Sequence, residues 1–427
     1  MANTYEMKDS GVEWIGQIPR TWKVGRIKYN YYLKGRIGWQ GLKADEFIDH
    51  GPYYLITGTD FDNGRIAWER CYRITEERFF EAPEIHVKTG DLLITKDGTV
   101  GKVAYIDSIP EKASLNSHLL IMRPLHKEYD NRFLFWVIQS AVFEKYCGVS
   151  QNGSIMASLS QEKMSDFSFP LPPEQEIEKL VSYLRKKCGA IDDIVAEAKA
   201  TIEEYKKWKA SVIFEAVTKG LDPNAEMKDS GVEWIGQIPK GWGVRRLKMA
   251  ARRLGLPAEN LHGYIGLENV KSGSGKLVEA AEGETTPEGQ ALKIYPGNVI
   301  FGKLRPYLAK CYLVEREGCC SSEFLVIKAE IMTPKFLKFL MLSPGFINEV
   351  NMATYGTKMP RANWEIVGGM RMPIPSASEQ TAIASYLDDK CAAIDGIIAE
   401  KEALITELEN YKKSLIFETV TGKRRVC

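Results

Sequence analysis

The sequence of this chain contains an internal repeat, which limits the folds that it can adopt. The fourteen residues Glu6–Pro19 (EMKDSGVEWIGQIP) recur without change as Glu226–Pro239, 220 positions later. The match continues more loosely beyond them, where Trp22 corresponds to Trp242. Self-similarity at a fixed offset is the signature of a duplicated architecture. The sequence therefore predicts two related halves rather than one continuous domain.

A second block near the end of each half repeats at an offset of 203 residues. Lys209–Thr218 (KASVIFEAVT) reappears as Lys412–Thr421 (KKSLIFETVT), and Ser182–Leu184 reappears as Ser385–Leu387. Because this offset is smaller, the second half must be shortened between its two repeated blocks. The predicted order is variable segment, helix, variable segment, helix, with boundaries at 1–169, 170–220, 221–372 and 373–427.

The segment that ends each half predicts a long helix. No proline occurs from Glu174 to Thr218, and Gly220 supplies a stop signal. Apolar residues follow a strict 4-3 spacing in both copies: Ile177, Val181, Leu184, Cys188, Ile191, Val195, Ala198, Ile202 and Tyr205, then Ala384, Leu387, Cys391, Ile394, Ile398, Ile405 and Leu408, with Gln380 and Lys401 as exceptions. A seam of this period predicts a left-handed coiled coil.

Two matching seams in one chain most simply bury each other, although two separate core helices remain the alternative. If a pseudo-twofold axis relates the copies, the helices run antiparallel and the variable segments lie at opposite ends. At about 1.5 Å per residue such a helix spans ~65 Å. The expected arrangement is a spacer with a variable domain at each end.

Each variable segment is expected to be a mixed α/β domain. Lys88–Tyr105 and Tyr295–Tyr312 both predict a strand, a tight loop and a second strand, because β-branched runs are interrupted by glycine and charge. Asn131–Ser140 and Pro334–Leu342 predict short apolar helices. The predicted fold class is therefore mixed α/β, with two such domains joined by two long helices in an antiparallel coiled coil.

Charge is segregated along the chain although its total is nearly balanced. The 57 basic and 56 acidic residues give a net charge of +1, which rules out a uniformly cationic surface. Yet Arg20–Ala44 and Lys240–Ala258 contain several lysines and arginines and no acid, and the first is interleaved with aromatic residues such as Trp22 and Tyr31. Clustered cations are what contacts to DNA phosphates need. A solvated basic face is the alternative.

Candidate DNA-contacting residues lie in these basic stretches, in the loop between the paired strands of each half, and in two later polar loops. Lysine and arginine on such loops can donate to guanine O6 and N7 in the major groove. The candidates are Lys34, Arg36, Trp39, Lys96, Asp97, Thr99, Lys102, Gln151, Asn152, Ser154, Arg252, Arg253, Lys303, Arg305, Tyr307, Lys310, Thr357, Lys358 and Arg361.

The search for catalytic motifs is negative. Gly275-Lys276 and Gly101-Lys102 lack the remainder of a phosphate-binding loop, and no GxSxG, HExxH or dinucleotide fingerprint occurs. The motif expected of an adenine methyltransferase is also missing. The eight cysteines form no CxxC pair and are expected to be free thiols, mostly in the core. No metal or catalytic residue is predicted.

The N-terminal residues do not look like a secretory signal, and no run of 18 apolar residues predicts a membrane span. A cytoplasmic location is therefore expected.

Several motifs together resemble the specificity (S) subunit of type I restriction–modification systems, over nearly the whole chain. They are KDSGVEWIGQIP in both halves, KGRIGWQGL at Lys34–Leu42, GDLLITKDGTVGKVA at Gly90–Ala104, GNVIFGKLRPYLAK at Gly297–Lys310 and YKKSLIFETVTGK at Tyr411–Lys423. One departure concerns the first helix. The family usually reads P-L-P-x-x-x-E-Q, as at Pro373–Gln380, whereas Glu174-Gln175 directly follows Pro173.

The resemblance implies two target recognition domains, each binding one half of a bipartite DNA site, with the helices setting the gap. It also implies two modification subunits, which carry S-adenosylmethionine and methylate adenine, and restriction subunits, which use ATP and Mg²⁺. No cofactor is then expected on this chain.

Since KGRIGWQGLKADEF has no close copy in ARRLGLPAENLHG, the two half-sites are expected to differ. The competing interpretations are a coiled-coil adaptor that does not read DNA, and an enzyme with an unrecognised active site.

Overall fold

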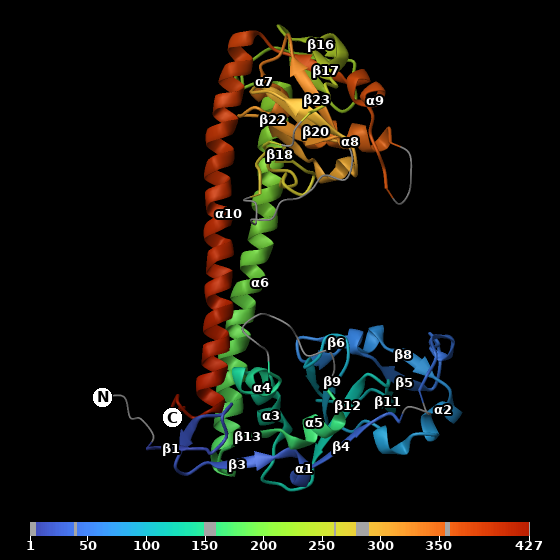
Figure 1. Cartoon of the computed structure of the whole chain (residues 1–427), viewed down its shortest axis with the longest axis vertical. Coiled ribbons are helices and arrows are strands. Elements are labelled where there is room, and N and C mark those ends of the chain that lie inside the picture. Colours follow the sequence, from blue (N-terminus) through green and yellow to red (C-terminus); the bar gives the residue numbers. More distant parts are fainter. Residues whose placement is uncertain are drawn as a thin grey trace. The chain divides into compact units, whose positions relative to one another are not determined.

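A computed structural model describes residues 6–37, 41–148, 159–259, 262–278, 290–354 and 359–426. The chain forms two compact units, Met1–Glu197 with Ala403–Cys427, and Ala198–Glu402. Each unit holds one α/β domain and a portion of both long helices (Figure 1). The predicted mixed α/β class is confirmed.

The first α/β domain is built around a four-stranded antiparallel sheet in the order β10-β9-β12-β4. Its strands are β4 (Tyr31–Gly35), β9 (Leu92–Thr95), β10 (Val103–Tyr105) and β12 (Leu119–Pro124). All four residues of β9 are buried, which explains its continuous apolar run. The strand–loop–strand predicted for Lys88–Tyr105 is thus confirmed as β9 and β10.

The rest of the first α/β domain surrounds this sheet. A second, mixed sheet has the order β11-β5-β8, with β5 and β11 parallel. The remaining bounds are β1 (Met7–Asp9), β2 (Gln17–Pro19), β3 (Lys23–Arg26), α1 (Ile27–Asn30), β5 (Tyr53–Ile56), β6 (Phe61–Asp62), β7 (Arg65–Ile66), β8 (Tyr72–Ile74), α2 (Glu76–Phe80), β11 (Ala113–Leu115), α3 (Asn131–Ile138), α4 (Ala141–Tyr146), α5 (Gln161–Asp166) and β13 (Ser168–Leu171).

The second α/β domain repeats the same central sheet. Its order β17-β23-β20-β21 matches β4-β12-β9-β10 strand for strand. In the smaller sheet, β18 pairs with β22 in parallel, as β5 does with β11, and the third strand is β19 beside β22. The bounds are β14 (Met227–Asp229), β15 (Gln237–Pro239), β16 (Gly243–Arg246), β17 (Ala251–Leu254), β18 (Tyr264–Ile265), β19 (Ala291–Ile294), β20 (Asn298–Gly302), β21 (Cys311–Leu313), β22 (Gly318–Ser321), β23 (Phe324–Ala329), α7 (Pro334–Leu342), α8 (Pro344–Met352), α9 (Trp364–Gly369) and β24 (Arg371–Ile374).

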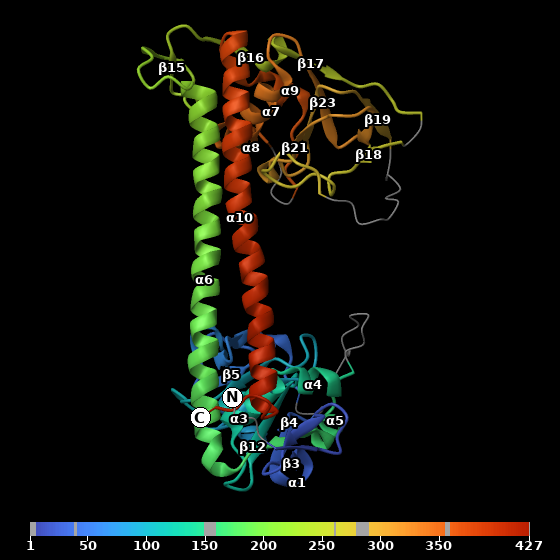
Figure 2. The ribbon, with the colours of Figure 1, turned by 90° about the vertical axis from the view of Figure 1, so that its left-hand side faces the viewer.

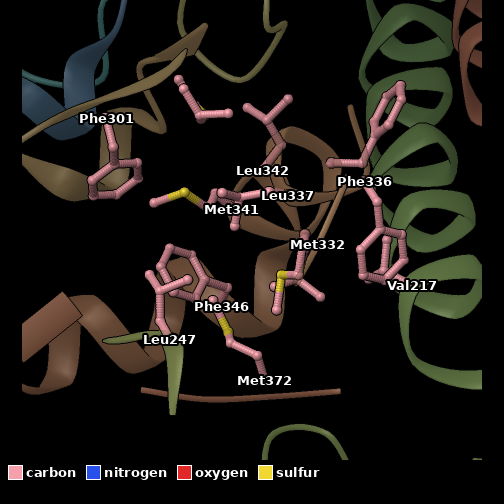
Figure 3. Packing of buried hydrophobic residues seen from close by; sticks show 14 of the residues in the cluster. Val217, Leu247, Phe301, Met332, Phe336, Leu337, Met341, Leu342, Phe346 and Met372 are labelled. Carbon is pink, nitrogen blue, oxygen red and sulfur yellow. The ribbon is translucent and has the colours of Figure 1, made fainter. Parts of the chain in front are cut away.

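The core of the second α/β domain joins its sheet to a long helix. Figure 3 shows Phe301 of β20, Phe336 and Met341 of α7 and Phe346 of α8 in one cluster with Val217 of the long helix α6 (Glu174–Lys219). All five side chains are fully buried. The end of α6 is therefore part of this domain's core.

The two long helices are confirmed as α6 and α10 (Ala377–Val420). In each unit a stretch of α6 lies alongside a stretch of α10, as both views show (Figures 1 and 2). The predicted seam is buried at most positions, from Ile177 at 4% to Ile202 at 5% on α6 and from Ala384 at 3% to Ile405 at 9% on α10. Gln380, an exception to the pattern, is buried and accepts the main-chain N–H of Thr333 at 2.6 Å.

The helices end against the tryptophan that follows each repeated block. In the first unit, Trp22 is fully buried and its indole N–H donates to Glu176 in the first turn of α6 at 3.0 Å. A Cβ on Gly422, just after α10, would lie only 3.2 Å from the Trp22 ring. The start of α6 and the end of α10 thus meet at one side chain, so the two helices run antiparallel within this unit.

The second unit repeats this junction with the helices exchanged. Trp242 donates to Glu379 in the first turn of α10 at 2.9 Å, and a Cβ on Gly220, just after α6, would lie 3.2 Å from the Trp242 ring. Gly220 has φ +76°, a conformation that glycine adopts without strain. The helix stop predicted at Gly220 is confirmed.

Equivalent lysine–aspartate pairs also join the helices in each unit. Lys209 of α6 lies 2.7 Å from Asp395 of α10, and Lys412 of α10 lies 2.6 Å from Asp192 of α6. The first pair is the more buried, since the side chains of Lys209 and Asp395 are 11% and 25% exposed. Burial would raise the pKa of Asp395, but the ammonium groups of Lys209 and Lys276 outweigh it and hold that pKa below its usual value.

Replacing Trp22 with alanine should lower the free energy of unfolding by about 3–5 kcal/mol, because it leaves a cavity where two helix ends meet. Trp22→Phe should cost less, since it keeps a ring and loses mainly the bond to Glu176. Urea unfolding measures both. Trp208→Ala is the matched control, because Trp208 is half exposed and its loss should change stability by less than ~0.5 kcal/mol. Equal effects of Trp22→Ala and Trp208→Ala would contradict the proposed junction.

Asp395→Asn should destabilise the chain by roughly 1–2 kcal/mol at pH 7, because it breaks a largely buried charge pair. The folded-state pKa of Asp395 is lowered, so this stabilisation is present above the unfolded pKa and is lost as the pH falls through the folded one. The difference from wild type should therefore shrink below about pH 4. Asp192→Asn, at the exposed counterpart, should cost less than ~0.5 kcal/mol. Thermal unfolding from pH 3 to 7 tests both, and an unchanged difference at pH 3 would refute the charge-pair account.

Candidate nucleic-acid interface

Three segments meet at one edge of the central sheet in the first α/β domain, and we call them loop cluster 1: residues 96–102, 116–118 and Leu159. The Lys96 N–H donates to the His118 carbonyl at 2.9 Å, and the Lys96 carbonyl accepts the Leu159 N–H at 2.7 Å. The buried hydroxyl of Thr95 accepts the Lys102 N–H at 3.0 Å, which closes the loop. Thr99 and Lys102 are exposed on it.

The three corresponding segments of the second α/β domain form loop cluster 2: residues 303–310, 321–323 and 359–362. Here the Lys303 N–H donates to the Glu323 carbonyl at 2.8 Å, and the Lys303 carbonyl accepts the Ala362 N–H at 2.8 Å. Lys303 therefore occupies the position of Lys96, Glu323 that of His118, and Ala362 that of Leu159. The main chain is conserved between the clusters, while most of the polar side chains differ.

The side chains that meet in loop cluster 2 are mainly cationic. Arg361 lies 2.9 Å from Glu323. Partial burial lowers the pKa of Lys303, and although Glu323 raises it, the nearby charges of Arg361 and Arg253 lower it further. One carboxylate, Glu323, and three cations from separate segments, Lys303, Arg361 and Arg253, therefore influence one another electrostatically. This excess positive charge suits a polyanion.

Arg305 sits at the turn of loop cluster 2 in a conformation that is unusual for a non-glycine residue, with φ +51°. Its N–H donates to the Pro360 carbonyl at 2.8 Å, which fixes the backbone, while its side chain is exposed. Such a left-handed residue costs about 1 kcal/mol or more. The next exposed side chain is Tyr307, 52% exposed on a turn of 3-10 helix, Pro306–Leu308.

The predicted contact residues fall into several groups. Lys96, Asp97, Thr99 and Lys102 come together in loop cluster 1, and Lys303, Arg305, Tyr307, Lys310 and Arg361 in loop cluster 2, joined by Arg253 from β17. Lys34 is exposed on edge strand β4, and Arg252 pairs with Glu330 at 3.2 Å. Those outside the described residues are Trp39, Gln151, Asn152, Ser154, Thr357 and Lys358.

Not all of these side chains present charge at the surface. Arg36 is 3% exposed and its guanidinium donates inward, to the Leu115 carbonyl at 2.8 Å and the Ser114 hydroxyl at 3.1 Å. The Lys310 ammonium reaches the Leu267 carbonyl at 2.5 Å. Within the first basic stretch, Trp22 and Tyr31 are also core residues rather than surface aromatics. In this stretch these two aromatic side chains are buried in the core, and the cations between them are exposed to solvent.

Sequence reasoning missed two residues at these clusters, His118 and Glu323. His118 Nδ1 lies 3.2 Å from Asp97, and Glu323 contacts Arg361. Each directly precedes the apolar strand β12 or β23. Because that strand runs antiparallel to β9 or β20, the residue before it must lie beside the loop that follows the neighbouring strand. A polar residue ahead of a predicted core strand was therefore the available signal.

Neither a metal site nor a membrane span is visible in the described part of the chain. No group of three or more potential ligands among histidine, cysteine, aspartate and glutamate could hold a metal ion there. No described helix is long and apolar enough to cross a membrane. The seven cysteines described are free thiols, five of them buried.

Comparison with known proteins gives a consistent result. Residues 40–204 match the sequence model of the family described as type I restriction modification DNA specificity domain. The chain is 23% identical to the type I restriction enzyme MjaVIII specificity subunit of Methanocaldococcus jannaschii, over 96% of this chain and 94% of that protein. It is 20% identical to the EcoDI specificity subunit of Escherichia coli, over 68% and 69% of the two chains.

A similar fold occurs in a solved structure. It comes from work on complex assembly and conformational transition of the type I R-M system. The alignment with one of its chains covers 94% of this chain and 98% of that chain. The TM-score is 0.67 at 14% sequence identity. The sequence comparisons confirm the resemblance to type I specificity subunits, and this structure shows that the fold is shared.

The left-handed turn at Arg305 makes a test of loop cluster 2. Arg305→Gly should be about 1 kcal/mol more stable than Arg305→Ala, because glycine adopts φ +51° without a Cβ penalty. Both variants lose the guanidinium, so the comparison isolates the backbone. Urea unfolding measures the difference. An alanine variant as stable as the glycine variant would show that Arg305 does not hold this conformation in solution.

Proposed function

We propose that this chain is the DNA specificity subunit of a type I restriction–modification system. The observation that carries the proposal is the pair of loop clusters: one main-chain scaffold built twice, with different polar side chains displayed on each copy. The similarity to type I specificity subunits over nearly the whole chain supports it.

Each α/β domain would bind one half of a bipartite site. Loop cluster 2 brings Arg253, Lys303 and Arg361 together, which suits phosphate and guanine contacts, whereas loop cluster 1 places the carboxylate of Asp97 beside Lys96 and His118. Carboxylates accept from the amino groups of cytosine, while arginines donate to guanine. Because the displayed chemistry differs, the two half-sites should differ, and the recognised site should be asymmetric.

The long helices would serve as the spacer between the two α/β domains that bind the half-sites. Their seam is buried in each unit, and the paired tryptophans tie a start and an end of the helices to each α/β domain. A helix of 46 residues extends ~69 Å. A rigid element of this kind would fix the number of unread base pairs between the half-sites.

The chain would recognise DNA rather than modify it. Adenine methylation would come from two modification subunits that bind S-adenosylmethionine, and translocation and cleavage from restriction subunits that use ATP and Mg²⁺. Such a subunit would act in the cytoplasm. A coiled-coil adaptor would need neither the duplicated loop clusters nor their segregated charge, so we favour recognition.

Methylation mapping tests the proposal. In a host expressing this chain with its modification subunit, adenine methylation should appear at a gapped, two-part, asymmetric motif, and it should be absent when either partner is omitted. Purified complex should bind that duplex with affinity that falls steeply with salt concentration. Salt-independent duplex binding and no motif would favour the adaptor, and a palindromic motif would contradict the predicted asymmetry.

A further inference from the structure

The pair formed by Arg361 and Glu323 has a geometry that suits one particular task. We propose that Arg361 reads a guanine in the half-site bound by the second α/β domain, and that Glu323 is the positioning residue that orients its guanidinium. This inference rests on the proposed function and deepens it. Neither residue is assigned a base contact by the family resemblance.

The backbone of Arg361 is held on both sides. Arg361 forms an antiparallel bridge with Leu304, and its neighbours Pro360 and Ala362 are bonded to Arg305 and Lys303, each at 2.8 Å. Ala362 is fully buried, which anchors the segment to the domain core. The Cα of Arg361 is therefore held in place. A residue that contacts a specific base edge requires such a fixed backbone.

Glu323 is equally fixed, from the adjacent segment. Its carbonyl accepts the Lys303 N–H at 2.8 Å and its N–H donates to the Ser321 hydroxyl at 3.2 Å. The side chain of Glu323 is 29% exposed, while that of Arg361 is 56% exposed. The carboxylate thus forms an ion pair with one nitrogen of the guanidinium, and the Arg361 side chain is the more exposed of the two. A guanidinium held in this way is prepared for a second, bidentate partner.

The acidic neighbour favours a base over a phosphate as that partner. A phosphate at Arg361 would bring a second anion close to the Glu323 carboxylate, and the repulsion would weaken the contact. Guanine O6 and N7 are uncharged acceptors spaced for an arginine fork, so Glu323 does not repel them. Lys303 and Arg253, which are also close, are the better candidates for the flanking phosphates.

The equivalent position in the first α/β domain supports a role in specificity. There His118 replaces Glu323 and lies 3.2 Å from Asp97. The main-chain bonds around the two positions are the same, with Lys96 and Lys303 donating to His118 and Glu323 at 2.9 and 2.8 Å. One scaffold position therefore carries a histidine in one domain and a carboxylate in the other. Such a difference is expected where two domains read different bases.

The test uses the full chain in complex with its modification subunit, on a panel of duplexes in which each base pair of the mapped site is changed in turn. Wild type should discriminate against replacement of one G·C pair by about 5- to 150-fold. Arg361→Lys keeps the charge and loses the fork, so it should abolish discrimination at that pair and leave the other pairs as they were. Glu323→Gln should weaken discrimination at the same pair.

Two further variants make the result interpretable. Arg371→Lys, an exposed arginine on β24 outside both clusters, should leave all discrimination unchanged. Asp97→Asn should affect only the other half-site. The inference is overturned if Arg361→Lys leaves discrimination intact, if it weakens binding equally on every duplex, or if the half-site has no G·C pair that depends on it. Should wild type itself yield no gapped motif, the proposed function fails instead.

Discussion

Everything else in this structure depends on the contact between an indole ring and two helix ends. Trp22 and Trp242 are each nearly fully buried, and each meets the first turn of one long helix and the glycine that ends the other. Burying an indole contributes several kcal/mol in principle. This contact fixes where the helices begin and end, and the chain that follows each tryptophan passes through one short strand and a helical turn before it enters the central sheet. The loop clusters are therefore built on a junction far from them in sequence.

The division between conserved and variable residues follows from that arrangement. Residues that make the junction, and several residues of the helix seam, are identical in the two halves, because both copies pack in the same way. The loop clusters share mainly their main-chain hydrogen bonds, since a backbone N–H and C=O can form the same bond whatever side chain the residue carries. Lys96 and Lys303 illustrate the consequence: their main-chain roles are the same, but Lys96 has His118 and Asp97 as neighbours, whereas Lys303 has Glu323 and two arginines nearby. Exposed side chains there can therefore change while these main-chain bonds are kept.

Much of this could be predicted from the sequence, for identifiable reasons. The long helices and their seam follow from a period of 3.5 residues, and β9 and β10 follow from apolar runs interrupted by a glycine-containing loop. What could not be predicted is long-range: that Arg36 turns inward to Leu115, or that Arg361, from a third segment, meets Glu323. These contacts join segments tens of residues apart, and a local pattern holds no information on which segments meet.

The two units differ in one respect that bears on how the chain is made. The second unit is a continuous stretch, Ala198–Glu402, whereas the first combines Met1–Glu197 with Ala403–Cys427. A nascent chain therefore has every residue of its second unit before it has every residue of its first, although the first leaves the ribosome earlier. Trp22 must wait for Gly422, some 400 residues behind it, while Trp242 follows Gly220 almost at once. The order in which the two units become complete is therefore the reverse of the order in which their synthesis begins.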